Sequence, residues 1–166
     1  GVVYGSGAFA AASGIRRFVI TGGTINGWVA AGCNGTDPNQ SGGTLPSDTY
    51  VYIGGTAHIG NATDLTLNTS SDGNVFGAGS GNAAQATTGR VNNSNVVIAD
   101  KSYIKNNVFG GGNFGYSNAT ATLYVTGGEV NGSVFGGSNQ KQGNTVSVNM
   151  TGGQVNTGIY GGSNVT

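Results

Sequence analysis

The residues able to do acid–base chemistry are few, and they lie far apart along the chain. The six acidic residues are Asp37, Asp48, Asp64, Asp72, Asp100 and Glu129. Glycoside hydrolysis needs two carboxyl groups about 5–9.5 Å apart, and only Asp64 and Asp72 flank one segment closely enough to suggest such a pair. Aspartates between Gly and Asn residues are more often solvated turn residues. We therefore expect no catalytic pair.

The remaining reactive residue types give no stronger signal. His58 is the single histidine and lies in the segment Ile53–Ile59 beside glycines, where a surface turn residue is the favoured interpretation. Cys33, the single cysteine, stands where other repeats carry Gly or Ser, so a small buried residue is favoured over a nucleophile. The Gly-x-Gly strings precede no helix and contain no phosphate-loop signature. We predict no enzyme activity, no metal and no cofactor.

Composition narrows the class of protein further. The chain has 166 residues, 34 of them Gly, with charged residues at 7% and a formal net charge of zero. A nucleic-acid partner would require a basic surface, and a membrane span would require an apolar run of about 18 residues or more; neither is present in the sequence. So little charge leaves little to keep a free monomer soluble. We expect a protein that assembles with itself or carries glycans.

Two short motifs recur along the chain, and the element that positions them must therefore recur too. The first motif begins with an aliphatic residue, which is usually followed by an aromatic residue, then by two or three small residues and often by Asn. The second, Thr-Gly-Gly-x-(Ile/Val)-Asn, begins at Thr21, Thr126 and Thr151, in each copy eight residues before the leading aliphatic. The core period is about 25–26 residues. The leading aliphatics are Val3, Val29, Val75, Val108, Val134 and Ile159, and the Asn residues are Asn34, Asn113, Asn139 and Asn164.

The segments between the motifs alternate with a period of two, as strands do. Val146, Val148 and Met150 share one face, as Leu123 and Val125 do one repeat earlier. A repeat of this kind buries its apolar face only by stacking on its neighbours. We therefore predict an all-β fold: one domain over residues 1–166, a β-solenoid (β-helix) of about five to six coils, with insertions near 34–49, 61–74 and 83–95. A β-sandwich of hairpins is the weaker alternative. The aliphatic and Asn residues would form ladders, and stacked Asn amides would hydrogen-bond along the axis.

The aromatic residues after the aliphatics leave two alternatives open. They are Tyr4, Phe76, Phe109, Phe135 and Tyr160. Strict alternation would place them outside as an apolar stripe, a lateral packing surface for another protomer. A bulge at the glycines that follow would turn them inward.

Sequons exceed the number that chance predicts. Asn-x-Ser/Thr occurs at nine positions, where composition predicts about four. Glycans at such positions would coat an uncharged surface. The other two sequons, at Asn34 and Asn164, belong to the proposed ladder, and an asparagine cannot serve both roles. The glycosylation candidates are therefore Asn39, Asn61, Asn68, Asn92, Asn118, Asn131 and Asn149.

The pairing of Val-Thr-Gly-Gly-x-Val-Asn-Gly with Val-Phe-Gly-Gly-Ser-Asn resembles glycine-rich β-helix repeats of prokaryotic cell-surface proteins, including adhesin-like, autotransporter-passenger-like, fibre and sheath proteins. The resemblance covers Thr21–Asn34, Val75–Ser80, Val108–Asn113, Leu123–Asn139 and Val148–Asn164. It implies an extracellular setting and a structural or adhesive role, and it carries no catalytic signature.

The leading functional prediction is a structural extracellular protein that self-assembles into a filament, sheath or surface layer by stacking and lateral packing. The partner would be the chain itself, possible surface glycans would be a second partner, and nucleic acid and a membrane span are not expected. No charged or proline-rich cap is visible at either end, which favours head-to-tail addition. The alternatives are an adhesin or passenger-type binding module that displays the insertions, and a polysaccharide-active β-helix enzyme.

Overall fold

The computed structural model describes residues 1–6, 14–34, 47–61, 72–81, 88–141 and 145–165, and the account below concerns these residues. They form fourteen strands and no helix. The strands are β1 (Val3–Tyr4), β2 (Arg16–Ile20), β3 (Thr24–Ile25), β4 (Val29–Ala30), β5 (Thr49–Ile53), β6 (His58–Ile59), β7 (Val75–Phe76), β8 (Val91–Ile98), β9 (Tyr103–Ile104), β10 (Val108–Phe109), β11 (Ser117–Val130), β12 (Ser133–Phe135), β13 (Thr145–Val155) and β14 (Gly158–Tyr160).

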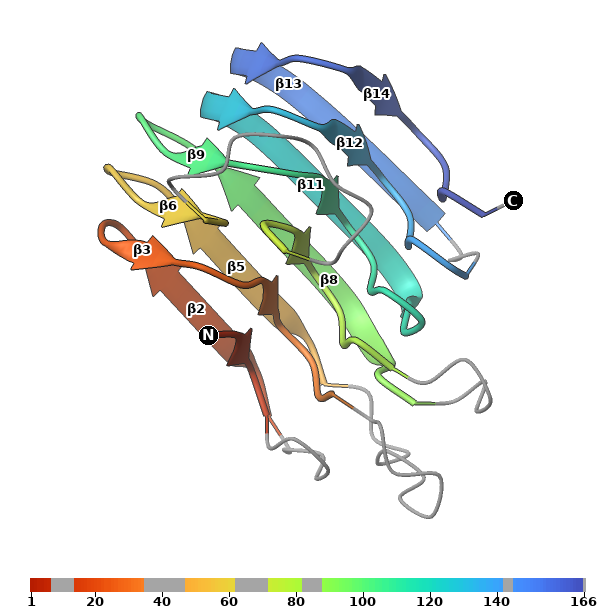
Figure 1. Cartoon of the computed structure of the whole chain (residues 1–166). Coiled ribbons are helices and arrows are strands. Elements are labelled where there is room, and N and C mark those ends of the chain that lie inside the picture. The colour runs from red at the N-terminus through yellow and green to blue at the C-terminus, as the bar shows by residue number, and fades with distance from the viewer. Residues whose placement is uncertain (7–13, 35–46, 62–71, 82–87, 142–144, 166) are drawn as a thin grey trace.

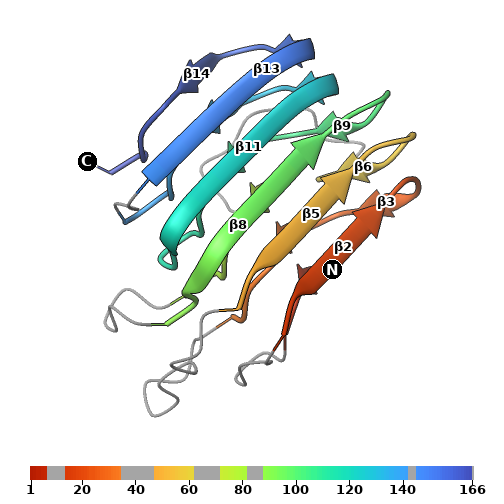
Figure 2. The same cartoon turned by 180° about the vertical axis from the view of Figure 1, so that it is seen from behind.

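The strands make two sheets in which every pair is parallel. One sheet has the order β1-β4-β7-β10-β12-β14; the other has the order β2-β5-β8-β11-β9-β6-β3, with β13 paired to β11. Strands at equivalent positions of successive repeats pair side by side, as β2, β5, β8, β11 and β13 do, so the colours run in order across the sheets (Figures 1 and 2).

The hydrophobic core fills the space between the sheets. Its long-strand side is formed by alternate residues of β5, β8 and β11, such as Val51, Val96 and Leu123, which are fully buried. The six leading aliphatics of the first motif supply the other side, in register: Val3 pairs with Val29, Val29 with Val75, Val75 with Val108, Val108 with Val134, and Val134 with Ile159.

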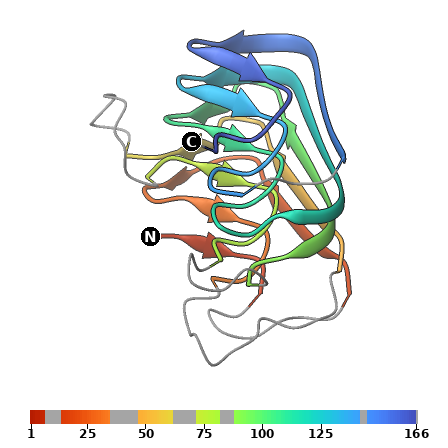
Figure 3. The same ribbon diagram turned by 90° about the vertical axis from the view of Figure 1, so that its right-hand side faces the viewer.

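The prediction of a β-solenoid, or β-helix, of five to six coils is wrong. The finding that overturns it is the arrangement of six and eight parallel strands in two sheets that curl into a half-barrel (Figure 3). A Gly-Gly pair is typical of a turn between strands, and Gly22–Gly23 does lie between β2 and β3. The other two pairs of the second motif lie inside β11 and β13, where Gly128 and Gly153 have φ of 75° and 81°. The β11–β13 pairing shifts register near Thr126 and then continues. A bulge bends a strand without ending it, so the long sheet curls.

Buried hydroxyl groups connect the two sheets. The Thr49 hydroxyl of β5 donates a hydrogen bond of 2.5 Å to the Gly77 carbonyl, and the Ser94 hydroxyl of β8 donates one of 2.5 Å to the Gly110 carbonyl. Ser94 also contacts the Ser117 hydroxyl. Thr49 and Ser94 are register partners, so these links repeat from strand to strand and satisfy carbonyl groups that the core would otherwise leave without a partner.

The predicted insertions fall mostly on residues 35–46, 62–71 and 82–87, outside the described residues. Within the described part of the chain there is no helix with the length and apolar character needed to cross a membrane.

Candidate functional site

Four of the five predicted aromatic residues form one continuous stack between neighbouring strands. The ring centroids of Phe76, Phe109, Phe135 and Tyr160 follow one another at 5.1, 5.0 and 4.9 Å, with interplanar angles of 12°, 7° and 13°. Phe76 and Phe109 are 1% exposed and belong to a second buried cluster, apart from the core that Val75 and Val108 enter. The rings therefore alternate with the aliphatic residues, as in the outward alternative, but they are covered and offer no exposed lateral stripe. Tyr4 lies on the same row beyond Ala30, and its ring meets Trp28 edge-on at 6.3 Å.

The edge formed by β13 and β14 exposes several apolar side chains. Ile159 is 45% and Tyr160 is 49% exposed, whereas their register partners Val134 and Phe135 are 0% and 8% exposed. Met150 of β13 is 41% exposed, and its partner Val125 is fully buried. Aliphatic and aromatic side chains that are buried on the neighbouring strands are thus exposed to solvent on β13 and β14.

A row of glycines follows the aromatic stack and sets how closely the strands approach. A Cβ built on Gly77 would clash with the Gly110 carbonyl, one on Gly110 with the Gly136 carbonyl, and one on Gly136 would lie 2.6 Å from the Gly161 carbonyl oxygen. The row ends at the β13–β14 edge, where a Cβ on Gly161 or on Gly162 would have no atom within 4 Å. Glycine at Gly161 therefore has no packing reason within the described chain.

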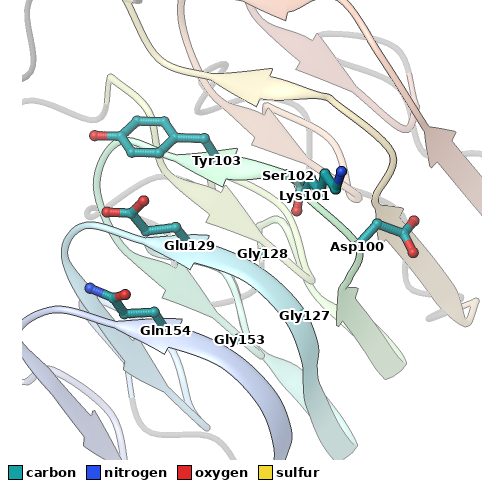
Figure 4. Close-up of a pocket in the computed structure, with 9 residues that line it drawn as sticks. All are labelled: Asp100, Lys101, Ser102, Tyr103, Gly127, Gly128, Glu129, Gly153 and Gln154. Carbon is teal, nitrogen blue, oxygen red and sulfur yellow. The ribbon is translucent and has the colours of Figure 1, made fainter.

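A polar groove lies on the outer side of the bend between long and short strands. It has a volume of about 510 Å³ and is lined by Asp100, Lys101, Ser102, Tyr103, Gly127, Gly128, Glu129, Gly153 and Gln154. Tyr103, Glu129 and Gln154 are register partners that project side by side from one wall, and Asp100 and Lys101 lie on the other side (Figure 4). The residue x of the Thr-Gly-Gly-x motif supplies Glu129 and Gln154 of this row, a signal in the sequence that our prediction did not use.

The groove's carboxylates are engaged in hydrogen bonds. Asp100 accepts one from the Gly55 amide at 2.7 Å and one from the Tyr52 hydroxyl at 2.8 Å, and these two bonds lower its pKa. Glu129 accepts one from the Asn156 amide at 2.9 Å. A glycosidase acid requires a raised pKa, the opposite of the shift at Asp100. The groove suits hydrogen bonding to a neutral polar molecule better than proton transfer.

His58 lies on the same outward row and stacks on Tyr103, with ring centroids 4.6 Å apart. Burial lowers the pKa of its imidazole. Among the described residues no hydrogen-bond partner reaches its buried Nε2 atom. A stacked ring between two strands explains this residue better than the surface turn residue that we predicted.

The remaining acids lie apart from one another. Asp48 accepts hydrogen bonds from the Asn93 amide and side chain at 3.1 and 3.0 Å. Asp72 lies 4.0 Å from the Nζ atom of Lys105, a fully buried lysine that the sequence prediction missed. Asp37 and Asp64 lie outside the described residues, so the expectation that Asp64 and Asp72 form no catalytic pair stays a prediction. Cys33 is buried with a free thiol. No cluster of three or more His, Cys, Asp or Glu side chains in the described ranges could hold a metal.

Three of the four predicted ladder asparagines form a continuous amide ladder. The Asn164 amide donates to Asn139 at 3.0 Å, and the Asn139 amide donates to Asn113 at 2.8 Å. Asn34 accepts a hydrogen bond from the Tyr4 hydroxyl at 3.1 Å. Each bond joins one repeat to the next.

The sequon asparagines differ in exposure. Asn118, Asn149 and Asn164 are exposed, whereas Asn34, Asn61, Asn92 and Asn131 are half-buried. Asn39 and Asn68 lie outside the described residues.

No protein-family model, no curated protein and no solved structure matches the chain. The resemblance to glycine-rich surface repeats accordingly stays a prediction.

Proposed function

We propose that the protein is a structural component outside the cell that assembles with copies of itself into a filament, sheath or surface layer. The observation that carries the proposal is the β13–β14 edge. Ile159, Tyr160 and Met150 are exposed there at positions whose partners one strand inward are buried. An unpaired strand edge that also exposes apolar side chains is a template for pairing with another chain.

Two chemical features support the location outside the cell. Exposed Asn118 and Asn149 stand in sequons, and such sites are acceptors in secreted proteins. Stability also rests on ladders of backbone and amide hydrogen bonds and on stacked rings, in a chain of which only 7% of the residues are charged.

The test is electron microscopy and sedimentation of the purified chain, with a matched pair of charge substitutions in β13. Val148 packs against the core, whereas Ser147 faces solvent. An inward-pointing lysine blocks edge pairing, so Val148→Lys is expected to keep the protein in small particles while wild-type and Ser147→Lys assemble. Circular dichroism reports whether each variant is folded. A folded wild-type chain that stays monomeric at high concentration contradicts the proposal.

A further inference from the structure

We propose that the β13–β14 edge binds the β1–β2–β3 edge of a second copy, head to tail and in one defined register, so that both sheets continue from copy to copy. This inference rests on the proposed function and specifies its partner and its contact. We choose a second copy as the partner because each row of register-paired residues begins at one edge and ends at the other. The β1–β2–β3 edge can therefore continue the rows that end at β13 and β14.

The pairings inside the molecule define the register between copies. Along the long sheet, Phe18, Val51, Val96, Leu123 and Val148 occupy one row. Along the other sheet, one row runs from Val3 to Ile159. Continuing each row by one strand places Val148 on Phe18, Met150 on Ile20, Val155 on Ile25, Ile159 on Val3 and Tyr160 on Tyr4 of the next copy.

The side chains at both edges suit this contact. Val3, Phe18, Ile20 and Ile25 on one edge, and Val148 and Val155 on the other, are half-buried residues that pack against the core from one side only. The contact would complete their burial, and β13 and β14 carry no charged residue that it would desolvate. Arg16 is the charged residue on the inner row of β2, and its guanidinium donates to the Ser47 carbonyl of its own chain at 3.2 Å.

The glycine row supplies an independent argument. Gly77, Gly110 and Gly136 each lack a side chain where the carbonyl group of the next strand approaches. Gly161 continues this row, although nothing within its own described chain approaches it. A second copy in the proposed register places the Gly5 carbonyl over Gly161, as the Gly161 carbonyl lies over Gly136.

The lateral and the symmetric alternatives fit less well. The rings that could have formed a lateral stripe are buried, apart from the end of the stack at Tyr160. A twofold contact between two β13–β14 edges would pair them antiparallel, whereas every pairing in both sheets is parallel. A head-to-tail contact is heterologous, and such contacts build filaments when the rotation does not close.

The first experiment substitutes Gly161→Val. The isolated chain has room for this side chain, so circular dichroism and the unfolding midpoint should match wild type, whereas the interface would be overpacked. We expect the critical concentration for assembly to rise by roughly tenfold or more. Asn149→Val, on the solvent-facing row of β13, is the matched control and should assemble as wild type does. Gly162→Ala provides a second, smaller obstruction on the neighbouring row, next to Gly161. Unchanged assembly of folded Gly161→Val overturns the proposed contact.

The second experiment measures the register by cross-linking in a Cys33→Ala background. Arg17→Cys with Ser147→Cys places the two thiols on adjacent strands of different copies, about 4.8 Å apart between Cα atoms, within disulfide range. Within one chain, three strands lie between these two positions, and they contribute Tyr50, Asn95 and Thr122 to the same row. The two thiols of one chain are therefore too far apart to form a disulfide. We expect a ladder of reducible oligomers.

The off-register control is Arg17→Cys with Thr145→Cys, shifted by two residues and facing the same side. It should cross-link poorly. Stronger cross-linking in the control, or a discrete dimer in place of a ladder, overturns the register while self-assembly stands. A folded wild-type chain that never assembles overturns the proposed function itself.

Discussion

At the scale of single residues, His58 couples folding to pH. Burial lowers the pKa of its imidazole below the usual histidine value of about 6.5, so the unfolded chain binds a proton more readily than the folded chain. Stability then falls as the pH drops below about 6.5, because the unfolded state gains the proton first. His58 is the single histidine, and carboxyl groups titrate at lower pH, which isolates its effect between about pH 5 and pH 7.

We therefore expect the unfolding free energy of wild type to decrease from pH 7 to pH 5, measured by urea denaturation. His58→Phe keeps a ring stacked on Tyr103 and removes the titration, so its unfolding free energy should stay nearly constant over that range. A His58→Phe variant with the wild-type pH dependence would show that another group is responsible.

Single residues also show which contacts the sequence predicts and which it does not. The fixed repeat length predicted that Val108, Val134 and Ile159 share one row, because an equal number of residues per repeat returns each copy to the same register. Lys105 carried no such signal: its register equivalents in neighbouring repeats are Gly60 and Asn131. Its burial depends on the space left by Gly60 and Gly73, which approach its side chain closely, and only the folded structure reveals such a contact.

At the scale of elements, a substitution of Thr49 tests whether the hydroxyl hydrogen bonds between the two sheets stabilise the fold. Thr49→Val keeps the shape of the side chain and removes the hydrogen bond to Gly77, leaving a buried carbonyl without that donor. We expect a loss of about 1–3 kcal/mol of unfolding free energy, measured by urea denaturation. Thr122→Val, on the outward row of β11, is the matched control and should change stability by less than about 0.5 kcal/mol. Equal effects of the two substitutions would mean that the link adds nothing to stability.

The same scale explains why the curl of the sheets escaped prediction. The alternation of Leu123 with Val125 and the Gly-Gly pairs indicated strands and bends, and both are present in β11. A Gly-Gly pair can either end a strand or bulge within it, and both conformations use the positive φ that Gly128 adopts. The difference lies in the hydrogen bonds to neighbouring strands, which resume at Glu129. Local sequence does not determine that pairing.

At the scale of the whole molecule, the two edges are equivalent in register but unequal in exposure. The rows that end half-buried at Val3 and Tyr4 end exposed at Ile159 and Tyr160. Of the predicted aromatic residues in the Phe76-to-Tyr160 stack, Tyr160 is the ring without a neighbour on its outer face in the described chain, so a role of these rings in assembly stays a prediction that concerns this end of the stack. The same repeat that buries a side chain inside the molecule exposes it at the edge.

Assembly through these edges should respond weakly to salt. The strands β13 and β14 carry no charge, and the whole chain has six cationic Lys and Arg residues and six acidic ones, so sodium chloride has few interactions to screen. Raising its concentration from about 0.05 M to about 1 M shortens the Debye length to about 3 Å, yet we expect the critical concentration, measured by sedimentation, to change less than about twofold. Sodium sulfate should lower it, because excluded salts strengthen apolar burial. Dissolution by sodium chloride would instead mean that ion pairs between other parts of the chain hold the copies together.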